Sequence, residues 1–292
     1  MIWSKPNISS PSGADPLLLW TARACALGAA AILALVVAFL VRESWPALSR
    51  LGFGRFLTDP SWHPTEGLYD LTPMLLGTLY SAAGALLLAV PLGVASALFS
   101  RFYAPASTAR CYRRVVELLA GIPSVVYGFW GLTTLAPLIG RLHPPGTSLL
   151  AGILILALMI LPTVALTSEA ALATVPAAHL RAAAALGLSR WGMIRGVALP
   201  AAKSGIAAGV MLAAGRAIGE TMAVLMVSGN VVQQPHRLFD PIRTLTANIA
   251  LEMSYAMGDH RSALFVSGLA LMAVVLVLVA IAESFGRERA GA

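Results

Sequence analysis

Residues 215–222 read Gly-Arg-Ala-Ile-Gly-Glu-Thr-Met and place two charges near the middle of an apolar segment that spans residues 205–227. At the centre of a membrane helix each charge costs roughly 2.5 to 3.5 kcal/mol, so both charges must be paired or used. The spacing of four residues predicts that Arg216 and Glu220 lie on one face of a helix. There they can meet each other, a neighbouring helix or an aqueous pathway.

The composition around this stretch is that of a membrane protein. Of the 292 residues, 58% are hydrophobic and only 11% are charged, and the mean hydropathy is +0.80. A soluble protein of this size needs more charged surface, so the apolar runs must face lipid and one another. The net charge of +7 comes from short clusters between these runs, which favours a role in membrane topology over nucleic-acid binding.

Six apolar segments are long enough to cross a bilayer as helices. They cover about residues 20–41, 73–99, 115–138, 148–168, 205–228 and 262–282. Their hydrophobicity does not alternate as it does in the strands of a membrane barrel. The sequence therefore predicts an all-α membrane protein with six transmembrane helices.

Lysine and arginine are unevenly divided between the two sets of loops. Twelve lie in the termini and loops on one side, at residues 1–23, 100–114, 169–204 and 283–292. Seven lie on the opposite side, at residues 42–72, 139–147 and 229–261. Because positive residues concentrate on the cytoplasmic side, both termini are predicted to be cytoplasmic. The two long external loops contain aromatic residues and are expected to carry short interfacial or docking helices.

The predicted cytoplasmic loop 169–204 has the pattern of two short helices. Residues 177–185 are rich in alanine, and Gly187 is a helix stop. Ser189 is an N-cap for a second helix over 191–199, which Pro200 is expected to end. Such a pair would present basic side chains to a cytoplasmic partner, or it is an ordinary basic loop beside anionic lipid.

The residues needed for enzyme chemistry are missing from the sequence. Neither of the two lysines, Lys5 and Lys203, stands in a phosphate-binding loop of the form Gly-x-x-x-x-Gly-Lys-Ser/Thr. The five histidines lie outside the apolar segments and lack metal-ligand spacing: His63, His143, His179, His236 and His260. No cofactor or metal is expected in this chain, and a transport protein is favoured over an enzyme.

Few polar residues lie in or beside the spans, and these are the candidates for a substrate pathway or gate. They are Ser124 and Tyr127 in the third span, and Arg216, Glu220, Thr221 and Asn230 in and beside the fifth. One Arg and one Glu are enough for a proton-coupled carrier, which stays open as an alternative. That class of protein, however, gives no role to the loop 169–204.

The loop 169–204 resembles the cytoplasmic loop of permease subunits from type I ABC importers. The matching positions are Arg181, Ala182, Ala183, Gly187, Val197, Leu199 and Pro200. Arg181 stands where that family usually has Glu. Residues 121–128 (Gly-Ile-Pro-Ser-Val-Val-Tyr-Gly) and 216–224, followed by Ser-Gly-Asn at 228–230, are similar to the PstC subfamily of phosphate importers.

The resemblance implies the type I ABC importer permease fold in a bacterial inner membrane. It implies a first span with its external loop (1–72), a permease core (73–283) with a coupling loop (169–204), and a cytoplasmic tail (284–292). Substrate would be inorganic phosphate, translocated by alternating access, or alternatively another oxyanion such as sulfate or molybdate. ATP and Mg²⁺ would be bound by a separate ATPase. The partners would be a second permease (PstA-like), a dimer of ATPase subunits (PstB-like), a phosphate-binding protein (PstS-like) and membrane lipid.

For Arg216 and Glu220 the resemblance leaves three interpretations. Arg216 contacts the anion in passage while Glu220 holds the guanidinium when the pathway is empty, since a planar guanidinium binds phosphate oxygens in pairs. Alternatively, the two form a salt bridge that only fixes helix packing. In the third interpretation, Glu220 relays protons.

Overall fold

The computed structural model describes residues 14–287, with side-chain environments for residues 18–281. Six of the described helical stretches are long and apolar enough to cross a membrane. They are Leu18–Leu51, Thr72–Tyr103, Ser124–Leu142, Leu149–Ala173, Arg190–Gly219 and Gly258–Ile281. The prediction of six transmembrane helices is confirmed. Two parts of the predicted terminal segments lie outside the described residues: 1–13, which contains Lys5, and 288–292, which contains Arg289.

Among the described residues, the regular secondary structure consists of helices and one small hairpin. Its helices are α1 (Ala14–Leu51), α2 (Arg55–Thr58), α3 (Thr72–Leu98), α4 (Ala106–Ala120), α5 (Ser124–Trp130), α6 (Ala136–Leu142), α7 (Leu149–Ala173), α8 (Ala177–Ala185), α9 (Arg190–Met193), α10 (Leu199–Gly219), α11 (Met222–Val227), α12 (Leu245–Glu252) and α13 (Gly258–Arg287). The hairpin pairs β1 (Trp62–His63) with β2 (Leu68–Tyr69) in antiparallel register.

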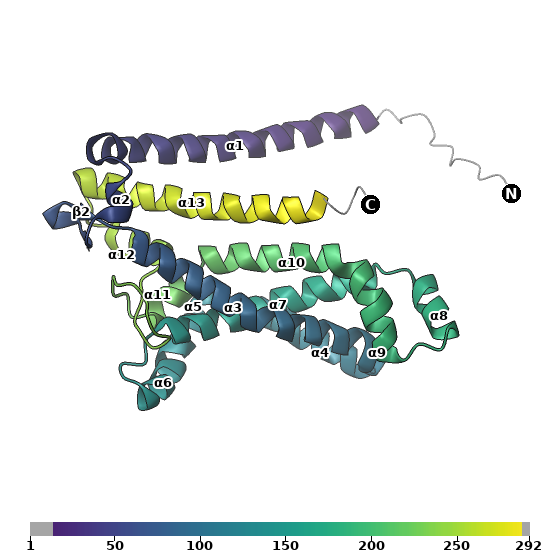
Figure 1. The fold of residues 1–292 in the computed structure, drawn as a ribbon. Helices are drawn as coiled ribbons and strands as arrows, with labels where there is room; N and C mark the ends of the chain where they lie inside the picture. Colours follow the sequence, from purple (N-terminus) through teal and green to yellow (C-terminus); the bar gives the residue numbers. More distant parts are fainter. Residues whose placement is uncertain (1–13, 288–292) are drawn as a thin grey trace.

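The bundle has two distinct ends. Figure 1 shows α2, β2 and α12 gathered at one end, here called the α12 end, and α8 and α9 at the other, here called the α8 end. The start of α1 and the end of α13 both point toward the α8 end. Both described ends of the chain therefore lie on one side, and its assignment to the cytoplasm stays a prediction.

Helix α7 is the centre of the bundle. Two-thirds of its membrane span is buried, and α3, α4 and α10 pack against it. Residues 149–162 of this helix are all apolar, which is typical of a helix that is surrounded by other helices. Its N-terminus is capped by Ser148, whose Oγ accepts a hydrogen bond from the Ala151 N–H at 3.3 Å. Because α3, α4 and α10 all pack on α7, this helix fixes their positions relative to one another.

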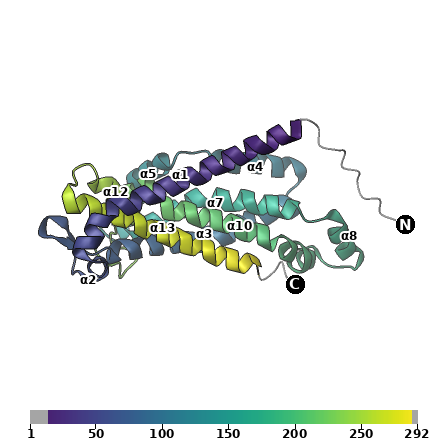
Figure 2. The same ribbon diagram turned by 90° about the horizontal axis from the view of Figure 1, so that it is seen from above.

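Helix α1 lies outside this core. The apolar window of its span has no buried residue, and its main neighbour is α13, which it crosses at an angle (Figure 2). Phe39 of α1 packs edge-to-face on Phe265 of α13, with ring centroids 5.6 Å apart. The helix is longer than the predicted residues 20–41, because its polar last part still packs through Ala47, Leu48 and Leu51 on the cluster that contains Trp62.

The third span differs from its prediction of residues 115–138. Helix α4 ends at Ala120, and the membrane span begins only at Ser124. Pro123 has no N–H to donate and disfavours helical geometry at the residue before it, so the chain turns at residues 121–123. The basic stretch predicted as a loop at 100–114 is instead a π-helical turn (Phe99–Tyr103) followed by the first part of α4.

The predicted loop 169–204 is shorter than expected, because α7 extends to Ala173 and the next span begins at Arg190. Within it, α8 has the predicted bounds, and Gly187 follows with a left-handed φ of +76°. The Ser189 Oγ accepts a hydrogen bond from the Gly192 N–H at 3.1 Å, as an N-cap does. Pro200 does not end the helix: a π-helical turn (Ile194–Ala198) precedes it, and a wider turn relieves the clash between a proline ring and the preceding turn.

The external loops contain the short helices that were predicted. Their core is a cluster in which Phe56 of α2, Trp62 of β1 and Tyr69 of β2 are buried together. Leu245 of α12 and Leu264 of α13 complete it. The α12 end is therefore a packed cap on the bundle and not a set of loose loops.

Candidate functional site

Helix α10 breaks inside the stretch that carries the two intramembrane charges. It ends at Gly219, Glu220 is extended with φ −68° and ψ 128°, and α11 begins at Met222. The prediction that Arg216 and Glu220 share one helix face is therefore wrong. Two contacts act at the break: the Glu220 Oε1 accepts a hydrogen bond from the Ala223 N–H at 3.1 Å, and the Glu220 carbonyl accepts one from the Thr246 hydroxyl at 2.9 Å. A carboxylate is favourable at a helix N-terminus, where N–H groups lack partners within the helix.

Arg216 turns to a different partner. Its Nη1 donates to the Thr163 Oγ1 of α7 at 3.1 Å. Among the described residues, Arg216 forms no salt bridge. A guanidinium has five N–H donors in a planar fork. Only one of them goes to Thr163, so the group is suited to bind an oxyanion.

The other predicted pathway residues hold the backbone around this site. The Tyr127 hydroxyl donates to the Leu119 carbonyl at 2.8 Å and so ties α5 to the end of α4. The Thr221 hydroxyl donates to the Gly219 carbonyl at 3.3 Å inside the helix break. Asn230 has a left-handed φ of 55°, and its Nδ2 donates to the Leu225 carbonyl at 2.8 Å. Ser124 is the first residue of α5.

The two sequence blocks that were singled out in the third and fifth spans meet in space. Helix α5 packs on α11 at Gly128, where an added Cβ would lie 2.8 Å from the Ala223 Cα. An added Cβ at Gly131 would likewise lie 2.7 Å from the Val227 Cγ1. Only glycine allows this approach, so α11 rests directly on the third span.

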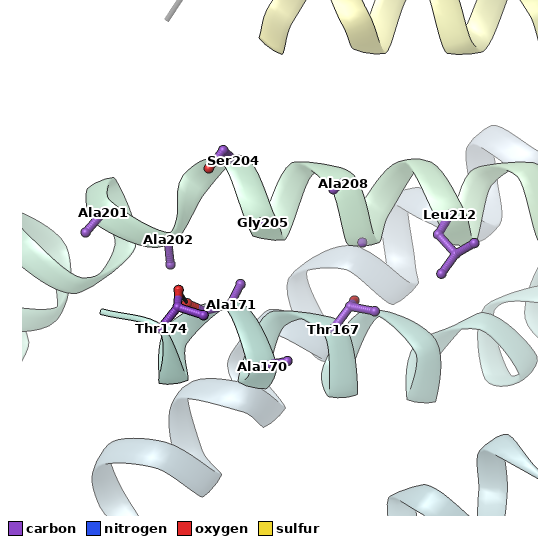
Figure 3. Close-up of a pocket in the computed structure, with 11 residues that line it drawn as sticks. Thr167, Ala170, Ala171, Thr174, Ala201, Ala202, Ser204, Gly205, Ala208 and Leu212 are labelled. Carbon is purple, nitrogen blue, oxygen red and sulfur yellow. Dashed lines mark hydrogen bonds between the residues drawn. The ribbon is translucent and has the colours of Figure 1, made fainter. Parts of the chain in front are cut away.

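A groove of about 460 Å³ runs between α7 and α10 toward the α8 end. Figure 3 shows Thr167 and Ala171 of α7, and Thr174 directly after its end, pointing toward α10, and Ala202 and Leu212 of α10 pointing toward α7. Thr163, the partner of Arg216, lies one helical turn above Thr167 on α7. The groove and the Arg216 site therefore follow the same pair of helices.

Gly209 sets the distance between these two helices. An added Cβ there would overlap the Thr167 hydroxyl and lie 2.7 Å from the Thr167 Cβ, and threonine is stiff at χ1. Gly209→Ala is expected to destabilise the folded chain by about 1 to 3 kcal/mol, measured as a lower melting temperature in detergent. Gly215→Ala is the matched control, because nothing lies within 4 Å of its added Cβ. Equal melting temperatures for the two variants would contradict the close packing.

Sequence analysis missed Thr163 and a buried ion pair at the α12 end. Thr163 contributes one hydroxyl beside Pro162 in a mostly apolar span. It lies on a different helix from Arg216, so no sequence spacing predicts their contact. The pair joins Arg243 to Glu252 at 2.6 Å, with side chains 18% and 9% exposed. Both residues lie in the predicted external loop 229–261, and their spacing of nine residues does not indicate an ion pair.

Comparison with known proteins identifies the class. Residues 89–288 match the family model of binding-protein-dependent transport system inner membrane components. The chain belongs to this family. A phosphate transport system permease protein PstC from Mesorhizobium japonicum is 39% identical, over 92% of this chain and 89% of that protein. A second PstC, from Pasteurella multocida, is 35% identical over 86% and 85%.

Solved structures show the same permease fold. A subunit of a bacterial alginate ABC transporter aligns with a TM-score of 0.67 and 16% identity, over 92% of this chain and 94% of that one. A subunit of the MetNI methionine ABC transporter aligns with a TM-score of 0.58 and 20% identity, over 75% and 93%. The predicted ABC importer permease fold is confirmed.

Family membership decides several earlier alternatives. The permease is a multi-pass membrane transport component and not an enzyme. Permeases of this family work with a separate ATPase and an extracytoplasmic binding protein. The proton-coupled carrier is therefore replaced by an ATP-driven importer. Arg216, Glu220 and their neighbours stay candidates, since the family match does not test individual residues.

The coupling-loop positions of the permease form one compact motif around α8 and the start of the fifth span. Ala183 is buried, whereas Ala182 is exposed. Arg181 is also exposed, and its Nε donates to the Ala177 carbonyl of its own helix at 3.4 Å. Val197 lies in the π-helical turn, and Leu199 and Pro200 begin α10. The loop stands beyond the bundle (Figure 1), where a soluble partner can reach it.

Proposed function

We propose that this permease subunit translocates inorganic phosphate into the cell by alternating access. The observation that carries the proposal is Arg216, a partly buried guanidinium that is held by a neutral hydroxyl and is not neutralised by an acid among the described residues. Relatives at 35% to 39% identity are phosphate transport system permease proteins. Phosphate is a tetrahedral oxyanion, and two of its oxygens can accept the two parallel N–H bonds that a planar guanidinium donates.

The helix break supplies the moving part in this proposal. Gly219, Glu220 and Thr221 join a long helix to a half-helix of six residues, so the two can tilt separately. The α8 end would face the cytoplasm and receive the push of ATPase closure through α8. The α12 end would face the binding protein. Arg216 stands between them and would contact phosphate as it passes.

We infer the partners from the same relatives. They are a PstA-like second permease, a dimer of PstB-like ATPases that bind ATP and Mg²⁺, and a PstS-like phosphate-binding protein. The permease itself would carry no cofactor. Arg181, which takes the place of an expected acid in the coupling loop, would alter the charge of the contact with the ATPase.

The test is to co-express the chain with an ATPase, a second permease and a binding protein of the proposed PstB-, PstA- and PstS-like kinds, and to reconstitute the complex in nanodiscs. Phosphate, sulfate and molybdate are each added with the binding protein, and ATP hydrolysis is measured. We expect phosphate alone to stimulate hydrolysis. Stimulation by sulfate or molybdate instead of phosphate would show that the substrate is that oxyanion. Transport by the chain without an ATPase would overturn its assignment as part of an ATP-driven importer.

Glu220→Gln separates the capping role of Glu220 from a proton relay. The amide oxygen of glutamine still accepts the hydrogen bond from Ala223 that Glu220 accepts at 3.1 Å, and the lost charge-dipole term is about 0.3 to 1 kcal/mol. We expect phosphate uptake within about fivefold of the wild type, since this energy corresponds to a factor of five or less. Uptake that falls below one-hundredth would instead favour the proton relay.

A further inference from the structure

The half-helix α11 is held at both of its ends by one external segment, residues 242–248. This segment includes the first turn of α12 and begins 15 residues after the end of α11. Such a double attachment is not required for packing, because α11 already rests on α5. It fixes where α11 stands relative to the helix break.

The beginning of α11 is held by Thr246. Its hydroxyl donates to the backbone carbonyl of Glu220 at 2.9 Å, and it lies 3.0 Å from the Thr244 hydroxyl. Thr244 caps α12 by accepting a hydrogen bond from the Ala247 N–H at 3.2 Å. The first turn of α12 is thus joined directly to the break that follows Arg216.

The end of α11 is held by Arg243. Its Nε donates to the Asn230 carbonyl at 3.0 Å, and the Asn230 side chain donates to the last turn of α11 at the Leu225 carbonyl. The neighbouring Ile242 N–H donates to the Ser228 carbonyl at 2.8 Å. The left-handed Asn230 is thereby held through its carbonyl by Arg243 and through its side-chain amide by Leu225.

Glu252 orients Arg243. Its Oε1 accepts from the Arg243 Nη1 at 2.6 Å, and its Oε2 accepts from the Trp62 Nε1 of β1 at 2.9 Å. His260 of α13 lies 2.8 Å from the same oxygen. Because Glu252 is buried, these contacts bind the segment to the external hairpin and to the sixth span as one rigid unit.

We propose that Arg243 and Thr246 are positioning residues that transmit movement of the external cap to the helix break beside Arg216. This inference rests on the proposed function, in which a binding protein docks at the α12 end. When docking shifts the cap, the two attachments carry α11 and the Glu220 backbone with it. Arg216 lies within the last turn of α10, so the gate responds to events outside the membrane.

Two variants release the attachments without leaving an unpaired buried charge. Thr246→Val removes one hydroxyl at nearly constant shape. Arg243→Met combined with Glu252→Gln removes both charges together, and glutamine still accepts from Trp62. The control is Gln233→Ala in the same external region, whose exposed bond goes to the Pro241 carbonyl and not to α11.

Two measurements are made on the reconstituted complex. The first is the ratio of ATP hydrolysis with phosphate-loaded binding protein to hydrolysis without it, which a general loss of folded complex would leave unchanged. The second is the labelling rate of Met222→Cys in α11, with Cys25 and Cys111 replaced by serine; Met222 is 45% exposed. We expect at least a fivefold lower stimulation ratio and at least a fivefold change in labelling for both release variants, and wild-type values for the control.

Wild-type values for Thr246→Val in both measurements would overturn the inference. If the unmodified complex shows no phosphate stimulation, the proposed function fails, but the labelling rate still tests whether the attachments position α11. If the Arg243 and Glu252 double variant does not assemble, Thr246→Val alone decides the outcome.

Discussion

Arg216→Lys is expected to reduce phosphate uptake at least tenfold although the charge is retained. Lysine is a point charge and cannot present two parallel N–H donors to the oxygens of one phosphate. It also cannot hold Thr163 and an anion at the same time in the geometry of the guanidinium, whose Nη1 alone donates to Thr163. A loss of one such charge-assisted bond, about 1.5 kcal/mol or more, corresponds to the tenfold effect.

The measurement is uptake of radioactive phosphate into proteoliposomes that contain the complete importer. Co-purification of the ATPase with the variant shows that assembly is intact. Thr163→Val is the companion variant, because it keeps the guanidinium but removes the hydroxyl that orients it. We expect it to raise KM for loaded binding protein several-fold with a smaller effect on kcat. Wild-type uptake by Arg216→Lys would show that Arg216 serves only helix packing.

The parts of the fold that the sequence predicts are those that depend on local chemistry. A membrane span is a sum of hydropathy over about 20 neighbouring residues, so all six spans could be located. Helix α8 has its predicted bounds, because Gly187 and Ser189 act within one turn of the chain. These features need no knowledge of what lies elsewhere in the bundle.

The break at Glu220 could not be predicted in the same way. Gly-Glu-Thr is compatible with a continuous helix, and the contact that holds the extended backbone comes from Thr246, 26 residues downstream. The contact between Trp62 and Glu252 joins residues that are 190 positions apart. A spacing rule such as i, i+4 describes neighbours on one helix. It fails where distant segments compete for the same side chain.

The start of the third span is marked in the sequence by local residues that disfavour a helix. Pro123 lies inside the predicted span 115–138, and a proline is tolerated there where neighbouring helices satisfy the backbone. The pair Gly121 and Pro123, however, both disfavour helix, and the arginines of α4 just before them make that helix a poor membrane segment. The basic composition of α4 and the two helix-disfavouring residues together place the start of the third span at Ser124.

Leu186→Asp is expected to release the ATPase from the complex and to abolish transport. Leu186 is 82% exposed at the tip of the α8 loop, and Leu188 and Trp191 beside it are 46% and 55% exposed. An apolar group held out in water at the α8 end is typical of a docking surface. In the complex, the variant would lose the burial of the leucine side chain and would bury a carboxylate in its place. Together these changes cost about 3 kcal/mol or more, which is roughly 100-fold in affinity for the ATPase.

Leu142→Asp is the matched control for this prediction. Leu142 is 84% exposed, almost the same as Leu186, but it ends α6 toward the α12 end of the bundle (Figure 1). The measurement is the amount of ATPase that co-purifies with each tagged variant. If both variants lose the ATPase, the added charge has harmed the membrane fold. If neither does, α8 docks through another surface. Loss with Leu186→Asp alone assigns the ATPase contact to the α8 loop, because the two variants differ only in the end of the bundle that is changed.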